Sequence, residues 1–303
     1  MISRVATFAM NDQMIDAALR AQSTMANEQL QEASGQISPG FGGLGSTSQQ
    51  VIDLQVSVTR SQSYIDAATA TDSKVQVMYS TLTSVTDLLT QLRSLLTGAS
   101  DSTTTDPATV TQSAQQMMQE LSSLLNTQYS GQYLFGGSRT TTPPVDISSS
   151  VYPAMTSPST ASTSYYQGDD QTASVRVSDT ETVPYGVTAD DPAFEQAMRA
   201  LNLVTNNSPL STPTLDEALD LATSAVGASA EIQARLGLAS SSIEAASEAQ
   251  SDYQNFAKTL GSNLTTVDVA AVTAQLSTYQ AQLTASYSAI SKIQSLNLAS
   301  YLR

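Results

Sequence analysis

The fold of this 303-residue chain is decided by one long stretch, VIDLQVSVTRSQSYIDAATATDSKVQVMYSTLTSVTDLLTQLRSLL (Val51–Leu96). Apolar residues recur in it at the spacing of a coiled-coil heptad. The heptad positions are Val51, Leu54, Val58, Ile65, Ala68, Val75, Tyr79, Leu82, Leu89 and Leu96. A helix of about fifty residues is several times longer than the average helix. Because its repeat is close to 3.5 residues, it requires a partner helix alongside its apolar seam.

Helical periodicity also precedes and follows this stretch. Apolar residues fall on one stripe over residues 1–32, which predicts an N-terminal helix. The glycine-rich segment 34–46 interrupts it, because glycine and proline are costly inside a helix. Gly98 is expected to end the long helix. A third helix follows, with Asp106 as its N-cap and Pro107 as its first residue.

The C-terminal part of the chain is helical as well. Thr214 and Glu217 have the spacing of a capping box, and the helix that they begin is predicted to run to about Leu260. A last helix is expected after Gly261. Its apolar positions continue almost to the end of the chain, in SAISKIQSLNLASYLR (Ser288–Arg303).

The period changes between these helical regions. In SGQYLFGGSRTTTPPVD (130–146) aromatic residues alternate with glycines, and residues 164–187 offer further short strands between turn residues. The pair Asp191-Pro192 then begins a short helix. We therefore predict a mainly α fold, a long antiparallel helical bundle formed by the N- and C-terminal regions with a small β-rich insertion in the middle.

These boundaries divide the chain into three regions. Residues 1–45 and 262–303 are predicted to be terminal coiled-coil arms, which would be disordered in the monomer because isolated helices are marginally stable in water. Residues 46–137 and 206–261 are predicted to form the helical bundle core. Residues 138–205 would be a variable β-rich outer domain with one short helix.

The composition argues against nucleic-acid binding. The formal net charge is −15, and only 12 residues are Lys or Arg, whereas phosphate binding requires clustered basic residues. Charged residues make up 13% of the chain, about half of the usual share of ~25%. Uncharged polar groups cost less to desolvate than ions, so this surface suits a subunit that packs against many neighbours.

Residues that carry catalytic chemistry are scarce. The chain has no Cys and no His, which removes thiol nucleophiles, Cys/His metal sites and the commonest general base. No phosphate-loop, HExxH or EF-hand motif is present. We expect no enzymatic activity, no cofactor and no bound metal.

Two kinds of local feature could still be interpreted as ligand sites. The pairs Asp169-Asp170 and Asp190-Asp191 could bind a cation, but Asp pairs in loops are more often turn formers and helix caps. The glycines of FGGLG and LFGGS could be phosphate loops, but neither is followed by the residues that phosphate binding requires. We interpret the first as caps or turns and the second as hinges or turns.

The sequence predicts neither a transmembrane helix nor a cleaved secretory signal. No run of about 18 apolar residues occurs. The N-terminal segment has an arginine at Arg4 but no uninterrupted apolar core and no convincing cleavage site. We expect no insertion into a membrane.

The apolar seams of the first and last helices lack evident partners inside the chain. To be buried, the two seams must pack either against each other or against further subunits. We predict that they form an assembly interface. Its predicted residues are Val5, Phe8, Ile15, Leu19, Val272, Leu276, Tyr279, Leu283, Ile290, Ile293, Leu296 and Leu298.

The chain resembles the bacterial flagellin superfamily. The core Leu-x-x-Ser-Tyr-Ser (Leu283–Ser288) and the ending Leu-x-Leu-x-x-Tyr-Leu (Leu296–Leu302) are very similar to flagellin-type C-termini. The segment 130–146 and the N-terminal RVATFAMNDQMIDAALRAQ are similar to hook-filament junction proteins, also called hook-associated protein 3. Many flagellins carry an Asp-Asp pair after the first helix, where this chain has SPGFGGLGSTSQQ. The resemblance covers about residues 1–137 and 206–303.

The resemblance implies a structural subunit that joins the flagellar hook to the filament. It implies export through the flagellar type III system without signal cleavage, an extracellular location, and terminal arms that form the inner layer of a helical tube. The implied partners are copies of the chain itself, the other hook-associated protein, flagellin and a flagellar export chaperone. The resemblance also leaves room for a flagellin of the filament itself.

A cytoplasmic signalling coiled coil is a further alternative. The long Ala/Gln/Ser-rich helices fit it, but it predicts a membrane span or a partner module, and the sequence contains neither.

Overall fold

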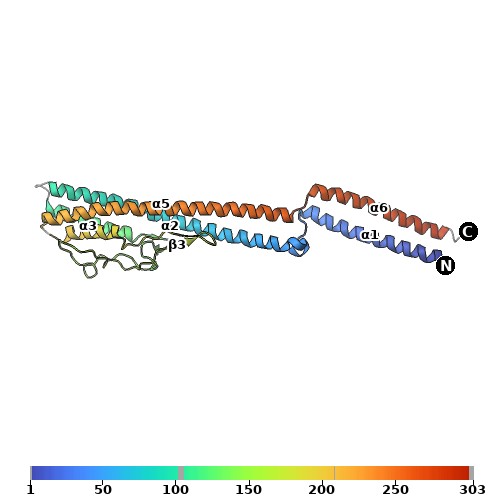
Figure 1. Ribbon diagram of the computed structural model, residues 1–303, viewed down its shortest axis with the longest axis horizontal. Helices are drawn as coiled ribbons and strands as arrows, with labels where there is room; N and C mark the ends of the chain where they lie inside the picture. The colour runs from blue at the N-terminus through green and yellow to red at the C-terminus, as the bar shows by residue number, and fades with distance from the viewer. Residues whose placement is uncertain (1, 102–105, 208, 300–303) are drawn as a thin grey trace. The chain divides into compact units, whose positions relative to one another are not determined.

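The computed structural model describes residues 2–101, 106–207 and 209–299, and leaves the side chains of residues 2–11, 101 and 293–299 undescribed. The chain is 71% helical, with two small antiparallel sheets in its middle region. Along the chain the elements are α1 (Ile2–Ser34), the 3-10 helix η1 (Phe41–Thr47), α2 (Ser48–Asp101), α3 (Pro107–Leu125), β1 (Gln128–Tyr129), β2 (Gln132–Tyr133), β3 (Ser174–Arg176), β4 (Thr182–Pro184), α4 (Pro192–Asn206), α5 (Thr212–Thr265) and α6 (Val269–Ala299). Figure 1 labels most of them. The mainly α prediction is confirmed.

The chain divides into two compact units. One consists of Ser61–Tyr253, and the other of Met1–Arg60 together with Gln254–Arg303. We call them the core unit and the terminal unit, and describe each by itself.

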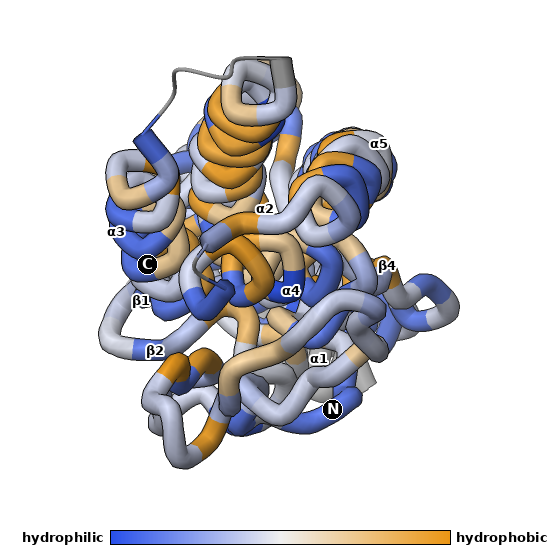
Figure 2. The backbone as a smooth tube through the Cα atoms, turned by 90° about the vertical axis from the view of Figure 1, so that its left-hand side faces the viewer, coloured by the Kyte–Doolittle hydropathy of each residue, from blue (hydrophilic) through white to orange (hydrophobic). Residues whose placement is uncertain are grey.

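The core unit contains the hydrophobic core of the protein. Within it α2 and α5 run antiparallel and are joined by side-chain hydrogen bonds, from Ser240 Oγ to Asp72 at 2.6 Å and between the hydroxyls of Thr86 and Ser229 at 2.8 Å. Hydrophobic residues recur along α2 turn after turn (Figure 2). The heptad leucines Leu82, Leu89 and Leu96 are completely buried, together with Leu121 and Leu125 of α3 and Phe194, Met198, Leu201 and Val204 of α4.

One heptad position was predicted wrongly. Tyr79 is 44% exposed, and its neighbour Met78 is buried instead. A straight α-helix has 3.6 residues per turn, so a strict seven-residue repeat drifts by about 20° per heptad. After four heptads from Val51 one row of the seam has moved by one residue, to Met78, Val85 and Leu92, while Leu82, Leu89 and Leu96 keep the original repeat.

Helix boundaries agree with the sequence where a side chain caps the helix. Asp106 accepts a hydrogen bond from the Ala108 amide at 3.0 Å, and Asp191 accepts one from the Ala193 amide at 3.2 Å. Pro107 and Pro192 follow as first helical residues. Both caps confirm the interpretation of Asp residues as helix starts.

Three other predicted boundaries are wrong. Gly98 and Gly261 do not end helices but lie inside α2 and α5. A helical glycine costs only about 1 kcal/mol relative to alanine, which the packing of a long helix easily offsets. Helix α5 begins at Thr212 rather than at the proposed Thr214 cap. Ser211 takes the capping position, with its hydroxyl 2.8 Å from that of Thr214.

The insertion contains the predicted short strands. The β1–β2 hairpin turns at Ser130 and Gly131, with φ of 50° and 77°, the left-handed pair that a two-residue hairpin turn requires. Strands β3 and β4 pair antiparallel, with Val175 opposite Val183. The rest of the insertion is irregular chain packed on α4.

Side chains of the helices hold this irregular chain in place. Asn202, completely buried, accepts from the Met155 amide at 2.8 Å and donates to the Pro153 carbonyl at 3.1 Å. Glu217 accepts from the Ser159 amide at 2.8 Å instead of closing a capping box. The buried Tyr165 hydroxyl donates to the Ala189 carbonyl at 3.0 Å.

Candidate assembly interface

In the terminal unit a backbone clamp joins the segment after α1 to the segment before α6. Gly35 follows α1 with φ of 67°, the left-handed conformation that commonly ends a helix at glycine. The Ile37 amide then donates to the Thr265 carbonyl at 2.8 Å, and the Val267 amide donates to the Gly35 carbonyl at 3.0 Å. Helix α1 ends at this clamp and α6 begins just after it, and the two helices pack against each other antiparallel (Figure 1).

Helix α6 supplies a heptad seam to this pair. Val272, Leu276 and Leu283 are buried, with 7%, 9% and 6% of their surface exposed, and Tyr279 and Ile290 are half-buried. The spacing alternates between four and three residues, as antiparallel coiled coils require. These five residues belong to the predicted interface, and the structure brings all of them onto one face of α6.

Helix α1 presents a different face to α6 than the sequence suggested. Its shielded positions are Met14, Ala18, Ala21 and Met25, and Ala18 is 5% exposed. The predicted residues Ile15 and Leu19 are instead 37% and 57% exposed. The side chains of the other predicted residues, Val5, Phe8, Ile293, Leu296 and Leu298, lie outside the described part of the chain.

The sequence contained a signal for the missed residues. Met14, Ala18, Ala21 and Met25 are themselves spaced by four, three and four residues. Two of them are alanines, so the stripe scores low for hydrophobicity although small side chains let two helices approach closely. The stripe with Ile15 and Leu19 has larger apolar side chains, and the sequence therefore favours it as the interface in place of the alanine-containing stripe.

Acidic side chains continue the α1 seam toward the clamp. Glu32 accepts a hydrogen bond from the Thr273 hydroxyl of α6 at 2.8 Å. Glu28 lies one turn earlier and is half-buried, and its Oε2 atom has no hydrogen-bond partner among the described residues. A polar pair such as Glu32 and Thr273 fixes the axial register of the two helices, because a shifted pairing would leave the carboxylate without its donor.

In each acidic pair of the core unit one member, Asp169 or Asp191, holds a turn or caps a helix. Asp191 caps α4 and also accepts from Arg235 of α5 at 2.9 Å. The Asp169 carboxylate accepts from both the amide and the hydroxyl of Ser138, beside the glycines of LFGGS. The hydrogen bonds from Ser138 hold the pKa of Asp169 below its ordinary value of 3.8. Within the residues described, no group of three or more acidic side chains is arranged to hold a metal ion.

No helix among the described residues is both long enough and apolar enough to cross a membrane.

Comparison with solved structures shows the same fold in proteins of low sequence identity. A protein assigned as a flagellar hook-associated protein of Vibrio parahaemolyticus matches with a TM-score of 0.61 at 16% identity, over 72% of this chain and 97% of that chain. The flagellar hook-associated protein-3 of Legionella pneumophila matches with a TM-score of 0.57 at 15% identity, over 70% and 98%.

A third structure, the flagellar junction protein FlgL of Legionella pneumophila, matches with a TM-score of 0.50 at 14% identity, over 65% of this chain and 99% of that chain. No curated protein matches the chain in sequence.

The fold and the paired termini define a class of helical subunits whose first and last helices lie together and whose middle carries an insertion. Two family models match the chain and identify its family within that class. The bacterial flagellin N-terminal helical region matches residues 5–140, and the bacterial flagellin C-terminal helical region matches residues 219–302. The chain belongs to the bacterial flagellin superfamily, a family of structural subunits of the flagellum.

Proposed function

We propose that this chain is a hook-associated protein that joins the flagellar hook to the filament. The observation that carries the proposal is the similarity of its fold to hook-associated and junction proteins over at least 97% of their length. Almost the whole length of each of these proteins therefore has a counterpart in this chain. The small insertion, confined to residues between α3 and α5, fits the same role.

In the proposed role the chain assembles with copies of itself into a short segment of helical tube. Such a tube is built from heterologous contacts, in which each subunit uses different surfaces toward different neighbours. The α1–α6 pair supplies a long, sparsely charged surface for these contacts. The remaining proposed partners are the other hook-associated protein, flagellin and an export chaperone, and the proposed route is type III export to an extracellular position without cleavage of a signal.

The proposed function does not include catalysis. It requires only binding surfaces, and the absence of His and Cys from the chain limits the chemistry that a second role could use.

Deletion of the gene in its own organism tests the proposal. We expect electron micrographs of the mutant to show hooks without filaments, and the culture medium to contain unassembled flagellin. A plasmid copy of the gene should restore filaments.

Two outcomes would contradict the junction role. Filaments of normal number and length in the mutant would exclude it. A mutant without flagellin in either the filament or the medium would instead indicate that the chain is the filament flagellin, which shares the same family models.

A further inference from the structure

Helix α1 carries a second apolar stripe that its own chain leaves uncovered. Ile15, Leu19 and Leu30 are 37%, 57% and 62% exposed, and Ala26 is exposed between them. At about 100° per residue this stripe lies about 130° around the helix from the seam with α6. Asp12 lies on the same face, one turn before Ile15. We call these five residues the outer stripe.

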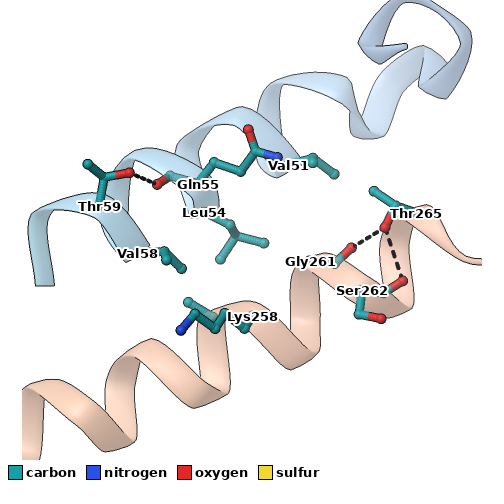
Figure 3. A pocket seen from close by; sticks show the side chains of 10 residues that line it. Val51, Leu54, Gln55, Val58, Thr59, Lys258, Gly261, Ser262 and Thr265 are labelled. Atoms are coloured by element: carbon teal, nitrogen blue, oxygen red, sulfur yellow. Dashed lines mark hydrogen bonds between the residues drawn. The ribbon is translucent and has the colours of Figure 1, made fainter. Parts of the chain in front are cut away.

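A groove in the same unit offers a matching surface. It lies between the beginning of α2 and the end of α5 and has a volume of about 390 Å³. Figure 3 shows Leu54 and Val58 of α2 facing Lys258 and Gly261 of α5, with Val51 further along the same side.

The groove exists because one wall is made of small residues. Ala257, Gly261 and Ser262 of α5 stand opposite the valines and leucine of α2. A Cβ atom built on Gly261 would meet no atom within 4 Å. The space beside Gly261 is therefore open. The α2 side of the groove is formed by the apolar Val51, Leu54 and Val58 together with the polar Gln55 and Thr59.

Lys258 is the charged side chain among the residues that line the groove. Its Nζ donates to Gln254 Oε1 at 2.6 Å. In a chain with a formal net charge of −15, a basic group beside an apolar groove favours a ligand that is apolar with one acidic end. The outer stripe has this composition, since Asp12 stands at the end of Ile15, Leu19, Ala26 and Leu30.

We propose that the groove of one copy receives the outer stripe of a second copy, with Asp12 of the stripe placed near Lys258. The proposal rests on the proposed function, because it assumes that the chain assembles with itself. The stripe is exposed in its own chain, so its own groove does not hold it. Groove and stripe are different surfaces, so the contact repeats from copy to copy and builds a tube or a ring instead of a closed pair.

The groove is long enough for one part of the outer stripe. The groove spans Val51 to Thr59 on α2, which at 1.5 Å per residue is about 12 Å. The whole outer stripe from Asp12 to Leu30 rises about 27 Å, and its part from Asp12 to Leu19 rises about 10 Å. Two apolar knobs, Ile15 and Leu19, fit within that length of groove.

Crosslinking between two variants tests the contact directly, because the natural chain has no cysteine. Cells would carry a Leu19→Cys copy and a Gly261→Cys copy in place of the natural gene, and their flagella would be purified and treated with a short bismaleimide. We expect a linked dimer that requires both copies. The control replaces the groove variant by Gly237→Cys, which is also a glycine inside α5 with open space around its Cβ.

The outcomes separate the inference from the proposed function. Flagella that contain the chain but give no more dimer than the Gly237→Cys control overturn the inference alone. Flagella that lack the chain altogether contradict the proposed function, and the inference falls with it.

Filling the groove provides a second test that does not depend on crosslinker reach. Gly261→Leu adds a side chain into open space, and Gly237→Leu makes the same change in α5 outside the groove. We expect the groove variant to be secreted and folded but at least tenfold less abundant in flagella than the Gly237→Leu control. Equal abundance of the two variants would overturn the inference.

Charge reversal tests the orientation of the stripe. Asp12→Lys and Lys258→Asp should each lower the amount of chain in flagella, because each places like charges together. A chain with both changes should recover most of it, since every copy then offers the reversed pair. Each single variant keeps a certain fraction of the wild-type amount of chain in flagella. If the double variant keeps only the product of these two fractions, Asp12 and Lys258 do not meet.

Discussion

At the scale of single residues, Asn202 shows how the irregular insertion is fixed. It is completely buried and bonds to backbone groups 47 and 49 positions earlier in the chain. A sequence cannot indicate such partners, because nothing local connects them. The Asp106 and Asp191 caps were predictable for the opposite reason, since each binds an amide only two residues further on.

Replacement of Asn202 by Ala should therefore destabilise the core unit. The change removes the hydrogen-bond partner of the half-buried Met155 amide and of the Pro153 carbonyl, and it empties a fully buried position. The loss of one partner inside a protein costs about 1–3 kcal/mol. We expect a loss of at least about 2 kcal/mol in the free energy of unfolding, measured by urea denaturation. The control is Thr160→Ala, an exposed residue of the same segment, which should change stability by less than about 0.5 kcal/mol. Equal effects of the two changes would show that Asn202 does not hold the insertion.

The Asp169–Ser138 contact gives a prediction about pH. Hydrogen bonds from Ser138 lower the pKa of Asp169 below 3.8. A carboxyl with a depressed folded-state pKa stabilises the fold above its unfolded pKa, and this contribution is lost as the pH falls through the folded pKa. Ser138→Ala should raise the Asp169 pKa toward 3.8, as measured by a carbon NMR titration of the carboxyl group. An unchanged pKa would mean that the Ser138 hydroxyl contributes nothing.

At the scale of helices, α1 was harder to predict than α2. The seam of α2 was visible because its large apolar residues follow one repeat, and only the drift at Tyr79 was missed. Helix α1 has two apolar stripes about a third of a turn apart. The sequence shows both, but only the position of α6 determines which one is covered.

The α1–α6 seam can be tested with one substitution. Leu283 is 6% exposed on α6, and Leu283→Asp would place a charge against α1. Because none of the side chains described in α1 and α6 belongs to the hydrophobic core cluster, we expect the main thermal transition of the chain to stay within about 2 °C of the wild type. Incorporation into flagella should be lost. A lower transition temperature comparable to that of Asn202→Ala would show that α6 is part of the core.

At the scale of the whole molecule, the hydrophobic core cluster lies in the core unit, as far as the described side chains show. Its members all lie between Ala68 and Ile243 in the chain. The remaining regions, which include the ends of the chain, add helices without adding to that core. The boundaries of the predicted arms, 1–45 and 262–303, remain a prediction.

This arrangement predicts what happens when residues 264–303 are removed. The truncated chain should unfold cooperatively near the wild-type temperature and sediment as a monomer, because the core unit keeps all of its buried contacts. Circular dichroism and sedimentation velocity would check both points. A truncated chain without a cooperative transition would mean that α6 is required for folding.

The clamp between Gly35 and Val267 determines where the terminal pair can come apart. Among the described residues, the backbone hydrogen bonds between the two segments lie at the clamp end of α1 and α6, so we expect separation to proceed from the other end of the pair toward the clamp, as in a zipper closed at one end. Amide hydrogen exchange should accordingly be slowest near Glu32 and Thr273 and become faster along both helices toward Met14 and Ile290. If the chain entered a narrow channel by either end, the least protected part of the helix pair would enter first.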